Sequence, residues 1–259
     1  MDLAQVISGF AVGAIVGVTG VGGGSLMTPL LVLLFGVAPA TAVGTDLLYA
    51  AITKSGGTVI HARRGHVDWR IVGLLAAGSL PAAALTLFLV SRFAPGGLGG
   101  AAGVIKVSLG VALLLTALAL VFRRRLQAWA RSHDVEALPP YRRARLTVAT
   151  GAVLGTLVSL SSVGAGALGV TALFFLYPRL TAVRIVGADL AHAVPLTLVA
   201  GLGHWWLGSI DWTLLGTLLV GSLPGIWLGS HFAHRIPERV LRPTLATMLV
   251  LVGGKLIAA

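Results

Sequence analysis

The sequence predicts an all-α polytopic membrane protein made of two inverted-topology repeats, each a broken re-entrant helix hairpin followed by three transmembrane helices. Its composition, its long apolar runs and an internal duplication lead to this prediction. Hydrophobic residues make up 56% of the 259-residue chain and charged residues only 10%, against about 25% charged in soluble domains. Runs of about 18 or more apolar residues are long enough to cross a bilayer. The expected spans are 43–60, 71–90, 101–122, 185–202, 212–232 and 244–259.

The basic residues lie where the loops of a membrane protein are expected. The formal net charge is +11, but the arginines stand between the apolar runs, where cytoplasmic loops fix the orientation of a membrane protein. Nucleic acid is therefore not an expected partner. The chain has no cysteine, which excludes disulfides, thiolate metal sites and thiol catalysis. These arginines include Arg63, Arg64, Arg123, Arg124, Arg125, Arg142, Arg143, Arg145, Arg235, Arg239 and Arg242.

The chain matches itself at an offset of 143 residues, which indicates an internal duplication. The tetrapeptide Gly78–Pro81 recurs unchanged as Gly221–Pro224. Near the start of each copy the offset is 142 residues, and there it aligns glycines. We expect a first repeat at 1–121, a basic linker at 122–146 and a second repeat at 147–259. Further matched residues are Gly44, Asp46, His61, Asp68 and Trp69 with Gly187, Asp189, His204, Asp211 and Trp212.

The charges of the loops predict that the two repeats have opposite orientations. The linker carries seven arginines and is expected to be a cytoplasmic loop, as is the basic loop at 61–70. The corresponding loop of the second repeat, 201–211, has no lysine or arginine, whereas its next loop, 231–242, holds three arginines. Inverted repeats are a common architecture of secondary transporters. Both termini are then expected on the outside.

Two short apolar segments at the start of each repeat predict half-helices that meet inside the membrane. They are Leu3–Thr19 and Ser25–Gly36 in the first repeat, and Thr147–Leu160 and Ala165–Tyr177 in the second. Non-helical backbone at that depth persists only beside protein or a water-filled cavity. We therefore expect both breaks to face a central cavity. A single tilted crossing in place of each hairpin is the alternative.

The residues at the two breaks have the composition of an anion site. Gly22, Gly23, Gly24 and Ser25 precede an apolar helical run, where free N–H groups and the helix dipole attract negative charge. The second repeat offers the same design with two hydroxyl groups added. The alternative interpretation is that small residues allow helices to pack closely. The second set consists of Ser161, Ser162, Gly164 and Gly166.

Four ionisable residues in the apolar regions are candidates for substrate binding or proton coupling. Asp46 and Asp189 are placed at the start of equivalent helices, where a carboxylate either caps the helix or forms a proton site. His192 follows Asp189 by three residues and shares its helix face, whereas the first repeat has Tyr49 at that position. Lys54 either supplies positive charge to an anion or extends its ammonium group to the membrane boundary.

Catalytic motifs are not found in the sequence. It contains neither a G-x-S-x-G elbow nor an H-E-x-x-H zinc motif, and its seven histidines are scattered. The Asp-Trp pairs at 68–69 and 211–212 are interpreted as helix caps with interfacial anchors. We therefore expect no enzyme activity, no cofactor and no metal site.

Several motifs together resemble the TauE/SafE family of sulfite and organosulfonate exporters. The resemblance covers nearly the whole chain, and it implies transport of a sulfur-containing anion, usually outward and coupled to protons or to the membrane potential. The second repeat departs from the fuller pattern because Ala165 replaces a glycine and Thr171 a proline. The motifs are Gly22–Gly24 followed by Pro29, Gly44–Asp46, Gly65–Trp69 and Gly78–Pro81.

The resulting hypothesis is a multi-pass secondary transporter of a bacterial inner membrane that exports sulfite, sulfoacetate or a related sulfonate by alternating access. Its expected partners are the anion and the lipid bilayer, with a homodimer left open. A passive anion channel and a non-transporting scaffold or assembly protein are the alternatives. Proton coupling is assigned to Asp46, Asp189 and His192. The expected substrate-binding residues are Gly22, Gly23, Gly24, Ser25, Thr45, Lys54, Ser161, Ser162, Gly164 and Gly166.

Overall fold

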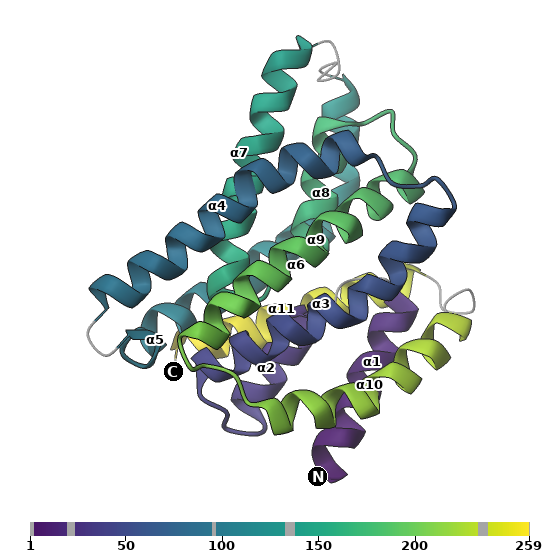
Figure 1. Cartoon of the computed structure of the whole chain (residues 1–259). Coiled ribbons are helices and arrows are strands. Elements are labelled where there is room, and N and C mark those ends of the chain that lie inside the picture. Colours follow the sequence, from purple (N-terminus) through teal and green to yellow (C-terminus); the bar gives the residue numbers. More distant parts are fainter. Residues whose placement is uncertain (1–2, 20–23, 95–96, 133–137, 233–237, 259) are drawn as a thin grey trace.

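The computed structural model describes residues 3–19, 24–94, 97–132, 138–232 and 238–258, and all regular structure in these ranges is helical. Figure 1 shows the helices packed into one bundle. The first half contains α1 (Leu3–Thr19), α2 (Gly24–Leu33), α3 (Pro39–Arg63), α4 (Trp69–Phe93), α5 (Gly97–Gly100) and α6 (Ala102–Ser132). The second half contains α7 (Pro140–Ser161), α8 (Ala167–Leu176), α9 (Ala182–Trp206), α10 (Trp212–Phe232) and α11 (Glu238–Ala258).

The helix lengths confirm a multi-pass membrane protein. Among the described residues, five helices are long and apolar enough to cross a membrane. The central helix α3 is not one of these five, although it has the same 25-residue length as α9. Asp46 and Lys54 lower the mean hydropathy of α3. The five apolar spans are Trp69–Phe93, Ala102–Phe122, Pro140–Ser161, Ala182–Trp206 and Trp212–Gly229.

Two predicted boundaries are wrong around the linker. The segment at 122–146, expected to be a loop, is helical for most of its described length, because α6 continues to Ser132 and α7 begins at Pro140. Pro139 and Pro140 start the helix, as proline suits a first helical turn. The first segment of the second repeat is therefore 22 residues long, long enough for a full crossing and not the half-helix expected at Thr147–Leu160. The bounds of α1 and α10 agree with the prediction.

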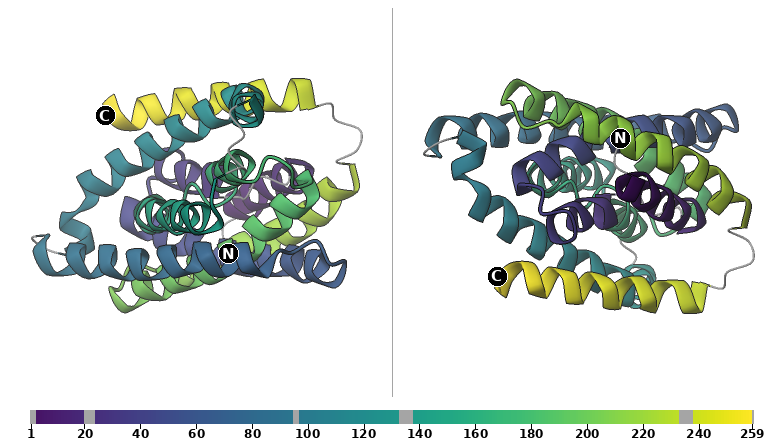
Figure 2. Two further views of the ribbon diagram at one scale, coloured as in Figure 1. Left: turned by 90° about the horizontal axis from the view of Figure 1, so that it is seen from above. Right: turned by 90° about the horizontal axis from the view of Figure 1, so that it is seen from below.

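Helices of one repeat pack mainly against helices of the other. α1 packs on α10 and α4 on α7, while α3 packs on α9 and α6 on α11. Under the repeat alignment α1 corresponds to α7 and α4 to α10, so the first two pairs are equivalent contacts. Figure 2 shows α11 along one long side of the molecule and α4 along the opposite side, with α1, α2 and α7 between them.

Glycines bring α1 and α10 into backbone contact. A Cβ atom on Gly9 would touch the backbone of Leu218, and one on Gly13 would touch that of Ser222. Residue numbers rise together along both helices, so α1 and α10 run parallel. Small residues four positions apart are the usual means of such close packing in membranes.

The equivalent contact between α4 and α7 has the same geometry. A Cβ atom on Gly151 would overlap the backbone of Leu75, and one on Gly155 would overlap that of Ser79. From the other side, Gly78 lies directly against the carbonyl oxygen of Val148. These two helices are therefore also parallel.

The equivalent central helices α3 and α9 lie side by side and run antiparallel (Figure 1). Gly44, near the start of α3, packs against His204 near the end of α9. In the same way Gly187, near the start of α9, packs against His61 near the end of α3. These two helices correspond to each other under the repeat alignment, and they run in opposite directions.

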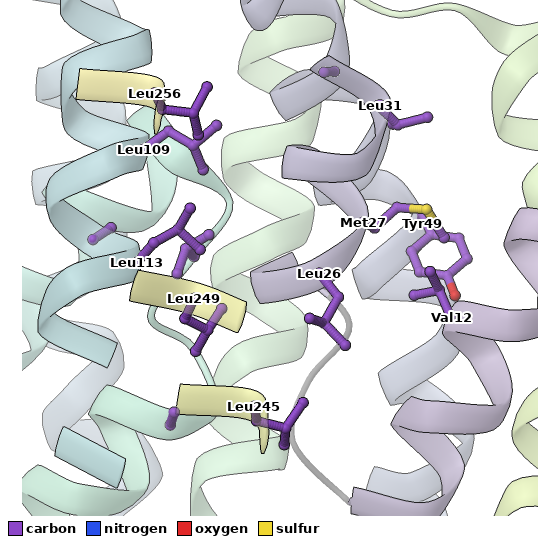
Figure 3. Close-up of a cluster of buried hydrophobic side chains, with 14 of the residues drawn as sticks. Val12, Leu26, Met27, Leu31, Tyr49, Leu109, Leu113, Leu245, Leu249 and Leu256 are labelled. Carbon is purple, nitrogen blue, oxygen red and sulfur yellow. The ribbon is translucent and has the colours of Figure 1, made fainter. Parts of the chain in front are cut away.

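Apolar packing fixes α2 between the outer and central helices. Figure 3 shows Leu26 of α2 on the side of Leu245 and Leu249 from α11, while Met27 lies beside the ring of Tyr49 on α3. All five side chains are at least nine-tenths buried. The short helix α2 is thus held on two faces, which positions its polar residue Thr28 against α3.

Two aspartates cap helices as the sequence predicts. The Asp68 carboxylate accepts a hydrogen bond from the backbone N–H of Ile71 at 3.3 Å, and the Asp211 carboxylate accepts one from that of Leu214 at 2.9 Å. Trp69 and Trp212 follow them with 62% and 55% of their surface exposed. Exposed indoles at the ends of apolar spans suit the membrane interface.

The glycine contact between α4 and α7 predicts a position-specific loss of stability. We expect Gly78→Ala to lower the free energy of unfolding by about 1–3 kcal/mol, because the new Cβ atom must displace the backbone of α7. Gly73→Ala on the same helix has open space around its Cβ position and should be neutral or slightly stabilising. Denaturant unfolding in detergent, followed by circular dichroism, measures both, and equal effects would contradict the packing.

Candidate functional site

The break between α7 and α8 has an irregular, buried backbone. Ser162 adopts a left-handed conformation with φ of 57°, and Gly164 and Gly166 have φ of 122° and 136°. Glycine accepts such angles without the steric penalty of a Cβ atom. Ser161 stabilises the turn, since its hydroxyl group accepts a hydrogen bond from the N–H of Val163 at 3.1 Å. The interruption predicted in the second repeat is thus present between Ser161 and Ala167.

In the first repeat, α1 ends at Thr19 and α2 begins at Gly24. Two of the predicted binding residues, Gly22 and Gly23, lie outside the described residues. The other two, Gly24 and Ser25, form the first turn of α2.

Lys54 reaches the break of the other repeat. Its side chain is buried on α3, with 7% of its surface exposed, and its Nζ donates a hydrogen bond of 2.7 Å to the backbone carbonyl oxygen of Ala165. The alternative in which this lysine extends to the membrane boundary is therefore wrong. The repeat alignment places Thr197 at the equivalent position of α9, so the interior cation belongs to one repeat only.

Asp46 and Asp189 lie well inside their helices. The prediction that they start these helices is wrong, because α3 begins at Pro39 and α9 at Ala182. Both carboxyl groups are buried, so neither serves as a helix cap.

The two carboxyl groups have different surroundings. Asp46 accepts a hydrogen bond from the hydroxyl group of Thr28 on α2, whereas Asp189 lies against Gly169 on α8. In the described part of the chain, the Oδ1 atoms of both aspartates have no hydrogen-bond partner. Lys54 interacts electrostatically with both carboxyl groups, which places these three charged side chains in one buried group.

His192 is held by a serine from another helix. Its Nε2 atom lies 2.8 Å from the hydroxyl oxygen of Ser79 on α4, while its Nδ1 atom has no hydrogen-bond partner among the described residues. No hydrogen bond joins His192 to Asp189 among the described residues, although both lie on α9. The equivalent pair in the other half consists of Tyr49 and Ser222, whose side chains are also buried and interact.

Two predicted binding hydroxyl groups have different surroundings. The Thr45 hydroxyl oxygen accepts a hydrogen bond from the backbone N–H of Asp211 at 3.1 Å, so it ties α3 to the start of α10. The Ser162 hydroxyl group is buried at the break and interacts with the Asp46 carboxyl group without hydrogen-bond geometry. It therefore keeps hydrogen-bonding capacity for another acceptor.

The group defined by Lys54, Asp46, Asp189, His192 and Ser162 is called the central polar cluster below. It combines one cation, two carboxyl groups and one imidazole with the hydroxyl group of the residue that follows the end of α7. Such groups are costly in a membrane interior and usually face a substrate or proton path. Within the described residues, no three His, Asp or Glu side chains gather as metal ligands.

Sequence reasoning missed the serine and threonine that hold this cluster. Thr28 lies between a methionine and a proline in an apolar run. It belongs to no motif that would identify it as a site residue. Ser79 did carry a signal, because it belongs to the tetrapeptide that recurs in both repeats. That tetrapeptide also contains the glycine of the α4 and α7 contact.

Apolar spans around a buried polar cluster are typical of multi-pass membrane proteins of the transporter class. The family model described as "Sulfite exporter TauE/SafE" matches residues 5–256. The chain therefore belongs to the TauE/SafE family, which confirms the resemblance.

Curated relatives extend over nearly the whole chain. "Probable membrane transporter protein YjnA" of Bacillus subtilis is 38% identical over 257 residues, which cover 99% of this chain and 100% of the relative. "Probable membrane transporter protein YdhB" of the same species is 29% identical, with 93% and 97% covered. "Probable membrane transporter protein MJ0441" of Methanocaldococcus jannaschii is 26% identical, with 96% and 92% covered. These names indicate membrane transporters rather than enzymes. No solved structure shows significant similarity to the chain.

The bond between Thr28 and Asp46 predicts a stability effect at the site. We expect Thr28→Val to lower the free energy of unfolding by about 1–3 kcal/mol, because it removes a donor from a buried carboxyl group at nearly constant volume. Thr116→Val is the matched control, since the buried Thr116 hydroxyl group bonds only a carbonyl oxygen of its own helix, that of Ala112. Its loss should stay below about 1 kcal/mol. Thermal unfolding in detergent compares the two variants.

Proposed function

We propose that this protein is a secondary transporter that exports a small sulfur-containing anion, such as sulfite, sulfoacetate or a related organosulfonate, across a bacterial inner membrane. The observation that carries the proposal is the hydrogen bond from buried Lys54 to the carbonyl oxygen of Ala165. It brings a positive charge to a helix start inside the membrane. Family membership supports the sulfur-containing substrate.

The second break supplies the donors that a sulfonate group needs. The three oxygen atoms of the sulfonate accept hydrogen bonds from backbone N–H groups at the start of α8, from the Ser162 hydroxyl group and from the Lys54 ammonium group. The free N–H groups and the dipole of a helix start favour an anion. Gly164 and Gly166 expose the backbone there for close approach. In the first repeat, Gly22, Gly23, Gly24 and Ser25 are proposed to offer a similar surface.

Helix directions support two inverted repeats, 1–121 and 147–259, joined by the basic linker 122–146. Equivalent helices α3 and α9 run antiparallel, while the exchanged pairs α1 with α10 and α4 with α7 run parallel. These directions are those of two units related by a two-fold axis in the membrane plane. Exchange of conformation between such units opens a central site first to one side and then to the other.

Coupling is assigned to the carboxyl groups and the imidazole of the central polar cluster. With both aspartates ionised, their charge exceeds that of Lys54 and repels an anion. Protonation of Asp46 or Asp189 removes this repulsion, so anion binding is linked to proton uptake. His192, held by Ser79, is the third group that exchanges a proton on this path.

The proposed role of Lys54 predicts a loss of substrate affinity. In proteoliposomes, Lys54→Gln should raise the KM for sulfoacetate about tenfold or more, because a charge-assisted hydrogen bond to the anion is removed. Lys54→Arg should retain part of the affinity. Lys106→Gln on α6 is the control, since this lysine is only partly buried and lies outside the central polar cluster. Saturable flux with unchanged KM in Lys54→Gln would exclude this lysine from the site.

The proposed coupling predicts a change in pH dependence. We expect flux in the wild type to rise when an imposed pH gradient drives protons in the direction of anion movement. Asp189→Asn and His192→Gln should flatten this response, because each variant removes a group that gains and loses the proton. Transport is measured with sulfite, sulfoacetate, taurine and sulfate under imposed pH and voltage gradients. Flux that does not saturate and follows the voltage without coupling to the pH gradient would indicate a channel.

A further inference from the structure

A polar pocket lies away from the central polar cluster, where α4 and α7 begin. It has a volume of about 200 Å³ and is lined by Arg70, Arg143 and Tyr177 on its polar side and by Ile71, Leu74 and Leu180 on its apolar side. The apolar spans Trp69–Phe93 and Pro140–Ser161 both begin here. The pocket is therefore at the membrane boundary, on the side that carries the basic loops.

Hydrogen bonds and ring contacts order the aromatic wall of this pocket. The Tyr177 hydroxyl group lies 2.8 Å from the hydroxyl oxygen of Thr147 on α7. The guanidinium carbon of Arg143 lies 5.3 Å from the centre of the Tyr177 ring, a distance typical of cation–π contact. A guanidinium group stacked in this way loses little freedom on binding an oxyanion.

Among the described residues that line this pocket, the one acidic side chain is already engaged. Asp68 accepts a hydrogen bond from the N–H of Ile71 at 3.3 Å, and its other carboxylate oxygen lies 3.7 Å from the Arg184 guanidinium group. Its charge is thus shared with a helix start and a third arginine. The net charge of the described side chains that line the pocket is positive. The parallel helices α4 and α7 both begin here and add the positive ends of their dipoles on the same side.

We propose that this pocket binds the phosphate group of an anionic phospholipid. Arg70 and Arg143 pair with the phosphate oxygens, and the first acyl carbons lie against Ile71, Leu74 and Leu180. This division into a charged and an apolar wall suits a lipid better than free phosphate, which has no apolar part. Basic pockets between transmembrane helices on the cytoplasmic side commonly bind anionic headgroups.

The repeat-related positions in the sequence do not carry these two arginines. The repeat alignment places Thr213 at the position of Arg70 and Met1 at that of Arg143. The repeats therefore share the helix pairs but not the arginines. A lipid that bridges α4 and α7 stabilises one of the two equivalent helix pairs, and only from one leaflet.

The test is lipid binding to the full-length protein in detergent, measured by native mass spectrometry and by thermal unfolding. The probes are dioleoyl phosphatidylglycerol, dioleoyl phosphatidylcholine and inorganic phosphate. We expect phosphatidylglycerol to bind and to raise the unfolding temperature, whereas the other two do neither. Arg70→Gln and Arg143→Gln should each weaken phosphatidylglycerol binding about tenfold or more, and Arg143→Lys should recover part of it.

Arg142→Gln is the matched control, because it removes the same charge one residue away while Arg142 bonds the hydroxyl group of Tyr141 outside the pocket. It should bind phosphatidylglycerol like the wild type. An equal loss in all glutamine variants, or equal binding of phosphatidylcholine, would overturn the proposal in favour of a diffuse surface effect. Equal stabilisation by inorganic phosphate would overturn it in favour of a free-anion site. Because no transport is measured, these outcomes are independent of the proposed function.

Discussion

A polar group inside a membrane must find its partner within the protein, and this constraint governs the centre of the molecule. The break between α7 and α8 frees backbone groups that lipid cannot satisfy. One of them, the carbonyl oxygen of Ala165, receives the ammonium group of Lys54 from the other repeat. Thr28 and Ser79 meet the same requirement for Asp46 and His192. Each of these bonds joins a helix to another helix or to the break between α7 and α8, so the polar centre also holds the bundle together.

The close helix pairs provide the framework for these bonds. Apolar side chains gain little from association inside lipid, so helix pairs depend on contact area and backbone approach. Glycines supply both at α1 with α10 and at α4 with α7. Because each pair takes one helix from each repeat, neither half is expected to complete its packing alone. Ser79 is next to Gly78, so the contact between α4 and α7 also fixes the position of Ser79 relative to His192.

The sequence predicted the membrane class and most helix positions, because the length of an apolar run is a local signal. The observed bounds of α10, Trp212–Phe232, are those that the sequence predicts. The linker was misread because arginines and prolines suggest a loop, although arginine is a good helix former and proline is favoured in a first helical turn. Lys54 could not be placed, since its contact with Ala165 joins residues 111 positions apart. Thr28 was missed for the same reason, as its partner lies on another helix.

The two repeats carry different residues at equivalent positions, which bears on the energy of the proposed transport cycle. If two identical halves exchanged conformations, the inward-open and outward-open states would be degenerate, and neither would be preferred at rest. The repeat alignment pairs Lys54 with Thr197 and Tyr49 with His192. An exchange of conformations between the repeats would therefore not form the same set of contacts. Under the proposed alternating access, the bond from Lys54 to the carbonyl oxygen of Ala165 would form in one state without an equivalent in the other. The empty carrier would then have a resting orientation set by this ammonium group.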